Sequence, residues 1–256
     1  MKRYFLALLI LFLTATLSFA AGVDGVVNPA VVDGVDTPDS VDGVSGLAAA
    51  APAGGCSGTM DFTDVEWVET DSGGDIAKTD SNTVTVDTIL GSADSNVSYN
   101  CGSGALNPLS INHDIDVLIT ASTGAVAIVG VWGISDDSTP TYNDMDTAND
   151  GIILYYYDAA ATGKTFVFKD LTNNDLDQVE WATGITTLTQ YYMKIVTNGS
   201  DLEARIYTNA NRTDGHVDTL VITPGATTYD YVSVVLSLDQ AFSETVSAVI
   251  ENLVIN

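Results

Sequence analysis

One segment concentrates oxygen ligands. The segment Asp136–Gly151 reads DDSTPTYNDMDTANDG and holds five aspartates and two asparagines. Calcium in proteins takes about six to eight oxygens, which carboxylates, amides and backbone carbonyls supply. The spacing differs from that of an EF-hand, because no glycine occupies the sixth position of a loop that begins at Asp144. We predict calcium as a cofactor held by Asp144, Asp146 and Asp150, with a solvated acidic loop as the alternative.

Aromatic residues lie close to this acidic segment. Sugar rings stack their apolar faces on aromatic side chains, while amides and acids bond the hydroxyl groups. Tyr155 and Tyr157 would share one face of a strand, since side chains alternate along it. Trp132 and Trp181 are further candidates. We predict a ligand site at Trp132, Tyr155 and Tyr157, on loops carried by a rigid scaffold. Tyrosines that flank a core with wet hydroxyls are the alternative.

The charge balance limits the class of partner. The chain has 34 Asp and Glu residues against 8 Lys and Arg, a formal net charge of −26. Such a surface repels phosphate backbones, so nucleic acid is excluded as a partner. The acidity fits divalent cations or cationic partners. It also fits the solubility needs of a secreted β protein.

The N-terminus has the pattern of an export signal. Lys2 and Arg3 precede the apolar run Tyr4–Phe19, and small residues lead to a cleavage position after Ala20. We predict a signal peptide over residues 1–20, with an uncleaved anchor as the alternative. The run is shorter than the roughly 20 residues that span a bilayer. We expect a secreted or cell-surface protein without membrane insertion after cleavage.

Residues 21–55 differ in composition from the rest of the chain. The sequence VDGV recurs at Val23, Val32 and Val41, and Ala, Gly and Pro dominate residues 46–55. Gly and Pro interrupt helices and sheet ladders alike. We predict a flexible, disordered low-complexity linker, with a tether or docking segment as the alternative.

The chain contains two cysteines, Cys56 and Cys101. In an oxidising compartment two cysteines most simply pair, so we predict a disulfide between them. Two free buried thiols are the alternative. A zinc site is not expected, because such a site needs four clustered ligands and the two histidines lie far away in sequence.

Residues 56–256 have the pattern of one all-β domain. Asn198-Gly199 accepts the backbone of a tight turn and joins two alternating segments into a hairpin. No amphipathic helix is convincing, and His113 lies on an apolar face and is expected in the core. About a dozen strands imply two packed antiparallel sheets. The predicted strands are Met60–Glu69, Thr83–Leu90, Asn96–Asn100, Ile111–Thr120, Ala125–Ser135, Gly151–Tyr157, Lys164–Lys169, Gln190–Thr197, Leu202–Thr208, Val217–Ile222, Asp230–Leu238 and Thr245–Ile255.

The hairpin region carries a family resemblance. Its sequence has a Tyr-Tyr strand with Lys, then "ARIY", then an "NRT" turn and an apolar strand. With the opening segment Asp61–Val86 and the closing "AVIENLVIN", it resembles concanavalin A-like (laminin G-like) jelly-roll domains. The resemblance implies a two-sheet antiparallel jelly-roll sandwich. It also implies a non-catalytic binding or adhesion module for a glycan or glycoprotein, assisted by calcium. We expect the hairpin to act as scaffold, with any site at the Asp136–Tyr157 loop and strand.

Two other functional interpretations stay open. Asp175, Asp177 and Glu180 resemble the acid cluster of retaining β-glucanases with this fold, which reads Glu-x-Asp-x-x-Glu. That resemblance implies a glycoside hydrolase with Asp175 as nucleophile, Asp177 as helper and Glu180 as proton donor. The shorter Asp175 departs from the pattern, and the preceding residues read as a turn. The third interpretation is a structural matrix component that assembles through sheet edges or the VDGV linker.

Overall fold

A computed structural model describes residues 56–71, 73–90, 93–123, 126–148, 150–159, 163–172, 179–225, 227–238 and 243–256. The predicted signal peptide and linker lie outside these residues. None of the described helices is both long and apolar enough to cross a membrane.

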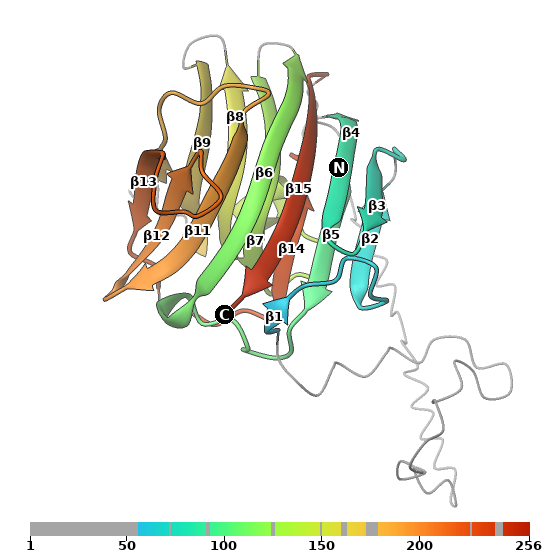
Figure 1. Ribbon diagram of the computed structural model, residues 1–256. Helices are drawn as coiled ribbons and strands as arrows, with labels where there is room; N and C mark the ends of the chain where they lie inside the picture. The colour runs from blue at the N-terminus through green and yellow to red at the C-terminus, as the bar shows by residue number, and fades with distance from the viewer. Residues whose placement is uncertain are drawn as a thin grey trace, which may run out of the picture. The chain divides into compact units, whose positions relative to one another are not determined.

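The described strands form two sheets (Figure 1). One sheet has eight strands, with β1 paired to β15 off the main path. In order along the main path they are β13 (His216–Ile222), β12 (Asp201–Tyr207), β11 (Gln190–Asn198), β6 (Asn112–Thr123), β15 (Thr245–Ile255), β4 (Thr83–Leu90) and β3 (Ile76–Asp80); β1 is Gly58–Thr59. The other has seven: β10 (Val179–Trp181), β9 (Gly163–Asp170), β8 (Ile152–Ala159), β7 (Val126–Ser135), β14 (Tyr231–Leu236), β5 (Ser95–Asn100), and β2 (Trp67–Asp71).

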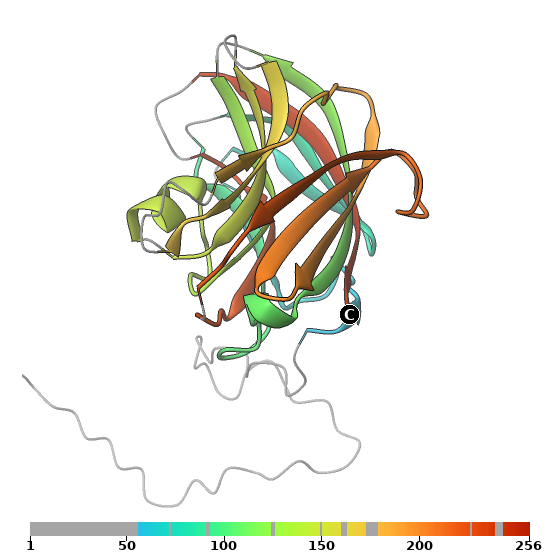
Figure 2. The same ribbon diagram turned by 90° about the vertical axis from the view of Figure 1, so that its left-hand side faces the viewer.

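The two sheets pack face to face as a sandwich (Figures 1 and 2). The strand pairs of both sheets are antiparallel. Inward residues alternate with outward ones, as Ile115, Met193 and Ala204 illustrate, and each of these three is fully buried in one continuous core. The prediction of an all-β jelly-roll sandwich is confirmed.

The predicted hairpin forms as expected. β11 and β12 pair from Tyr192↔Tyr207 to Asn198↔Asp201. Gly199 in the turn has φ of 70°, a backbone conformation that glycine adopts without strain. Apolar residues of both strands point into the core, so the outward residues of the hairpin stand on a rigid sheet.

The predicted strand Met60–Glu69 is wrong from Met60 to Glu66, and only Trp67–Glu69 lies in a strand, β2. The carboxylate of Asp61 accepts hydrogen bonds from the backbone N–H and hydroxyl of Thr63, at 2.9 and 2.6 Å. This local bonding stabilises a turn in place of a ladder. The chain therefore makes β1 and β2 as two short strands on different sheets.

The sequence also missed α1 (Tyr142–Ala148), which lies within the predicted acidic loop. The helix packs on the outer face of the seven-stranded sheet (Figure 2). Its one buried residue, Met145, joins a second hydrophobic cluster with residues of β8, β9 and β14. Lys169 on β9 reaches up to Asp146 on the helix at 2.8 Å. The part of this face around Met145 is therefore covered by protein.

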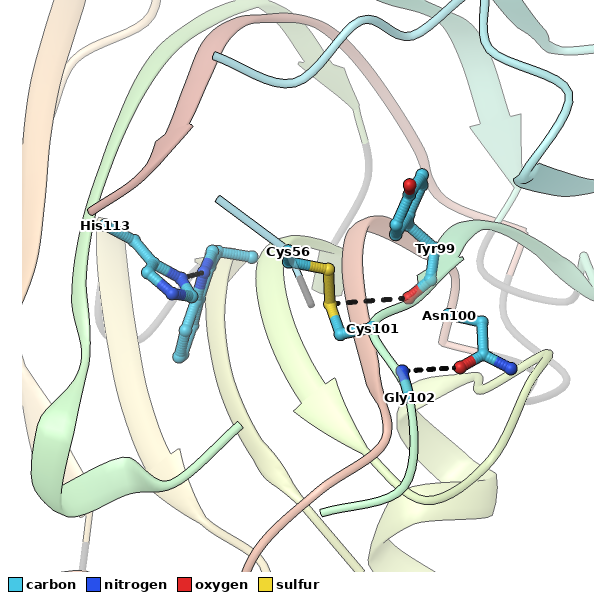
Figure 3. Close-up of a disulfide and its surroundings, with 7 residues drawn as sticks. Cys56, Tyr99, Asn100, Cys101, Gly102 and His113 are labelled. Atoms are coloured by element: carbon cyan, nitrogen blue, oxygen red, sulfur yellow. Dashed lines mark hydrogen bonds between the residues drawn. A yellow bond between two sulfur atoms is a disulfide. The ribbon is translucent and has the colours of Figure 1, made fainter. Parts of the chain in front are cut away.

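The predicted disulfide is present between Cys56 and Cys101 (Figure 3). It joins the segment before β1 to the residue after β5, across 45 residues of sequence. Gly102, next to it, donates its N–H to the side chain of Asn100 at 2.8 Å. The bond thus ties the two sheets together at one end of the sandwich.

His113 is a core residue, as expected. It is 2% exposed, and its Nδ1 accepts a hydrogen bond from Nε1 of Trp132 at 3.1 Å. Burial lowers the pKa of His113 from 6.5 to about 4, since the charged imidazolium is poorly solvated there. The neutral ring is the form that the fold accommodates.

We expect His113 to make stability pH-dependent between pH 6.5 and 4. In this window the unfolded chain binds a proton that the folded chain does not, so stability is present above 6.5 and falls as pH drops. The loss should reach roughly 3 kcal/mol at pH 4. Urea unfolding of wild type and His113→Gln across this range measures it, because glutamine accepts the Trp132 bond without titrating.

The exposed His216 provides the control for that experiment. His216→Gln should keep the wild-type slope, while His113→Gln should lose this part of it. Equal slopes in wild type and His113→Gln would contradict the assignment.

Candidate functional site

The outer face of the eight-stranded sheet is polar, and we call its outward residues on β6, β11, β12, β13 and β15 the polar face. Directly paired residues of antiparallel strands point to the same side. One such row crosses the sheet, with the pairs Glu251↔Asp116, Asp116↔Tyr192, Tyr192↔Tyr207 and Tyr207↔His216. Five strands thus place two carboxyls, two phenols and an imidazole in line.

A second row lies next to the first. Asp114 pairs with Lys194, and Lys194 pairs with Arg205. Arg205 forms an ion pair with Glu203 on its own strand, whereas Lys194 makes no ion pair with any described residue. A half-buried ammonium group without a counter-ion is available for an anionic ligand.

β11 contributes three polar side chains to this face, at every second position. They are Gln190, Tyr192 and Lys194. The Nε2 atom of Gln190 is buried without a hydrogen-bond partner. The described residues also leave the hydroxyl of Tyr192 without a hydrogen bond. Buried polar atoms are normally satisfied, so the fold leaves an unusual unpaired donor at Gln190, next to Tyr192 on the same side of the strand.

The loop between β12 and β13 folds over β11 and closes part of the face (Figure 1). Arg212 in this loop donates to the backbone carbonyl of Met193 at 3.2 Å and lies over the ring of Tyr192 at 5.8 Å. Its guanidinium also pairs with Asp116 and, at 3.7 Å, with Asp114. The loop is therefore anchored across two strands of the polar face.

Asp116 is the centre of this anchor. The amide of Asn252 donates to it at 2.9 Å from the other side. Burial raises the pKa of Asp116, while the bonds from Asn252 and Arg212 act in the opposite direction. Arg212 and Asn252 have φ of 52° and 53°, which is rare for residues other than glycine. Strained backbone of this kind clusters at functional sites.

The polar face offers acid–base and anion-binding groups together. The Tyr207 ring meets the His216 ring edge-on at 5.6 Å, and Nε2 of His216 bonds the hydroxyl of Thr219 at 2.8 Å. Phenols and imidazole transfer protons, and cations with amide donors hold carboxylates. The arrangement can therefore bind an acidic ligand and move protons at it.

The predicted ligand-binding aromatics lie elsewhere. Trp132 is fully buried between the sheets, where it bonds His113. Tyr155 is buried beneath α1, 5.2 Å from the ring of Tyr142, and burial raises its pKa. Tyr157 is half-buried and contacts Trp181. The structure brings Tyr155 and Tyr157 to one face of β8, but not together with Trp132.

The predicted calcium ligands point to separate partners. Asp144 accepts bonds from the backbone and hydroxyl of Thr141, and Asp146 pairs with Lys169. Asp150 accepts the N–H of Asp136 at 3.1 Å. Within the described part of the chain, no three His, Cys, Asp or Glu side chains are grouped for a metal ion. Calcium binding at these residues stays a prediction.

The predicted acid cluster is described only at one residue. Asp175 and Asp177 lie outside the described residues. Glu180 is exposed on β10, at the edge of the seven-stranded sheet, opposite Phe168. The roles of all three acids in hydrolysis stay predictions.

The sequence did contain a signal for the polar face. Gln190, Tyr192 and Lys194 alternate with the buried Tyr191, Met193 and Ile195. This alternation alone predicts a scaffold, because it gives the side of the strand on which a residue lies but not the residues of neighbouring strands. The residues that complete the face come from β6, β13 and the β12–β13 loop.

Comparison with solved structures found similar chains at low sequence identity. Alginate lyase Aly36B is 16% identical, with TM-score 0.45 over 80% of this chain and 98% of that chain. The marine PL7 alginate lyase AlyA1 from Zobellia galactanivorans is 12% identical, with TM-score 0.39 over 68% and 93%. A functionally unknown Saccharomyces cerevisiae protein is 7% identical, with TM-score 0.47 over 77% and 98%. No family model and no curated protein matches the chain.

These findings contradict two sequence-based expectations. The domain was expected to be a non-catalytic binding or adhesion module, and not an enzyme. Several similar structures are alginate lyases, which are enzymes, so both expectations are withdrawn. The likeness itself extends to the fold alone.

Proposed function

We propose that the polar face binds an acidic polysaccharide and cleaves it by β-elimination. The observation that carries this proposal is on β11, where the unpartnered amide of Gln190 and the unpaired ammonium of Lys194 flank Tyr192. Both are hydrogen-bond donors, the ammonium group suits a carboxylate, and the phenol between them is a proton-transfer group.

β-Elimination fits these groups chemically. A uronic acid carries its carboxylate on C5, and neutralising that carboxylate makes the C5 proton more acidic. A base removes this proton, the electron pair forms the C4=C5 double bond, and the C4–oxygen bond breaks. The departing oxygen takes up a proton. Lys194 would hold the carboxylate, and the paired phenols Tyr192 and Tyr207 would handle the two protons.

Charge supports an acidic substrate at this face. The chain as a whole is strongly acidic, with 34 acidic residues against 8 Lys and Arg residues. Three of those cations, Lys194, Arg205 and Arg212, lie on or over the polar face. Arg205 is paired with Glu203, and Arg212 with Asp116 and Asp114, which leaves the ammonium of Lys194 as the cation that a polyanion can meet there.

The test is activity on a panel of acidic and neutral polysaccharides, alginate and polygalacturonate included. Elimination produces a conjugated double bond with ultraviolet absorbance together with new reducing ends, whereas hydrolysis produces reducing ends alone. We expect both signals on an acidic polymer. Lys194→Met should weaken them at least about tenfold, because a charge-assisted contact to the carboxylate is lost.

Lys78→Met is the matched control, because Lys78 lies on the same sheet but bonds the carbonyl of Trp67 instead. It should keep full activity. Reducing ends without a double bond would contradict elimination and favour the hydrolase, for which Glu180→Gln should abolish activity. Absence of both signals on the whole panel would contradict catalysis at this face.

We propose that the protein acts in an extracellular compartment. Polysaccharides of this kind are extracellular polymers, and the disulfide fits an oxidising environment. The signal peptide predicted at residues 1–20 would deliver the domain there.

A further inference from the structure

Trp181 is an exposed aromatic ring at an edge of the seven-stranded sheet. Its exposed fraction is 45%, and the other large hydrophobic residues exposed in the described part of the chain are aliphatic. Indole rings usually bury their large apolar surface, so one that remains in solvent and is held in place indicates a contact surface.

The ring is fixed in orientation. Trp181 pairs with Val167 on β9, which sets its side chain on the outer face of the sheet. The ring of Tyr157 meets it edge-on at 5.5 Å, with 79° between the planes. α1 covers its part of this face through the cluster around Met145; Tyr157 packs against that cluster, and Trp181 lies outside it.

A pocket of about 300 Å³ opens beside the indole. Two hydrogen bonds hold its lining residues in place. The hydroxyl of Thr165 donates to the carbonyl of Ala182, and the N–H of Thr183 donates to Asp218 on β13 at 3.1 Å. The space next to Gly184 is open, with nothing within 4 Å of a Cβ placed there. The lining residues are Lys164, Thr165, Trp181, Ala182, Thr183 and Gly184.

We propose that Trp181 and this pocket form a second polysaccharide-binding subsite, which takes one uronate ring of an acidic chain. The axial C–H bonds of a pyranose make a flat apolar face that suits an exposed indole, and threonine and backbone groups suit its hydroxyls. The charged group among the lining residues is Lys164, whose side chain is 35% exposed. It holds Asp158 at 2.9 Å and keeps further N–H donors for a carboxylate.

The pocket and the polar face are joined by one short segment. The chain runs directly from Trp181 to Gln190, the first residue of β11. Leu188, in between, donates its N–H to the carbonyl of Ile119 on β6 at 2.8 Å. The choice of an acidic ligand rests on the proposed function, whereas the stacking site rests on Trp181 and its pocket.

The first experiment is a fluorescence titration with alginate oligosaccharides. Trp67 and Trp132 are 2% and 0% exposed, so ligand-induced change in emission reports on Trp181. The titration uses the Tyr192→Phe protein, which keeps the oligosaccharides intact. We expect saturable quenching that is absent in Tyr192→Phe/Trp181→Phe. An unchanged emission across the titration would overturn the proposal.

The second experiment is gel electrophoresis through immobilised alginate. Trp181→Ala should lower the affinity about tenfold, since a stacked ring is worth on the order of 1 kcal/mol or somewhat more. Val68→Ala is the matched control, because Val68 is 46% exposed on β2 at the opposite edge of the same sheet. It should bind as wild type does. Equal affinity for Trp181→Ala and wild type would contradict the subsite.

The two proposals can fail separately. Binding that depends on Trp181, in a protein without elimination activity, would leave the subsite standing and remove the proposed function. Elimination activity with binding unaffected by Trp181→Ala would do the reverse.

Discussion

Replacing Tyr192 with phenylalanine should lower kcat on the cleaved polysaccharide by about 10²–10⁴-fold, the usual contribution of a positioned proton-transfer group. The change removes one oxygen atom, and this hydroxyl bonds no described residue. The ring contact with the Arg212 guanidinium is kept by phenylalanine. The fold should therefore be undisturbed, and the loss should appear in kcat more than in KM.

Tyr231→Phe is the control for this variant. Tyr231 is half-buried on β14 of the other sheet, where its hydroxyl accepts a bond from Asn100 at 3.3 Å. That variant should keep wild-type kcat. The melting temperature of both variants shows whether the fold is intact, and a Tyr192→Phe protein with full activity would exclude Tyr192 from proton transfer.

Removing the Cys56–Cys101 disulfide should lower the free energy of unfolding by about 4 kcal/mol, from the loop entropy of 45 residues. Unfolding should begin locally at β1, because this strand has two residues and pairs with β15 at two positions. Without the covalent bond little holds β1 to the sheet.

Urea unfolding of the Cys56→Ser/Cys101→Ser protein measures this loss. Adding reductant should shift the unfolding midpoint of wild type toward that of the variant and leave the variant itself unchanged. A wild-type midpoint that does not respond to reductant would mean that the bond contributes no stability.

Much of the fold could be predicted from local sequence. Strands with one apolar side, such as Thr83–Leu90 and Thr245–Ile255, were predicted with the bounds that the structure has. The misses have local causes. α1 was missed because its seven residues bury only Met145, which leaves no apolar stripe to detect. β10 has three residues, too few to show an alternation.

The polar face could not be predicted in the same way. Alternation along β11 shows that Gln190, Tyr192 and Lys194 point outward. It does not show that Asp116 lies on one side of Tyr192 and Tyr207 on the other, which depends on strand order and register. Arg212 lies over the polar face because it belongs to the loop between β12 and β13. No sequence pattern predicts its positive φ of 52°.

Because α1 covers part of the seven-stranded sheet, the outer faces of the two sheets have different roles. The outer face of the seven-stranded sheet beneath α1 is occupied by a small hydrophobic cluster, whereas the polar face carries groups without partners. Substitutions on the solvent side of the acidic segment therefore change surface charge and solubility without reaching the polar face. The chain can be made less acidic there for engineering purposes, or adapted to a different salt concentration, while the chemistry on the opposite sheet stays as it is.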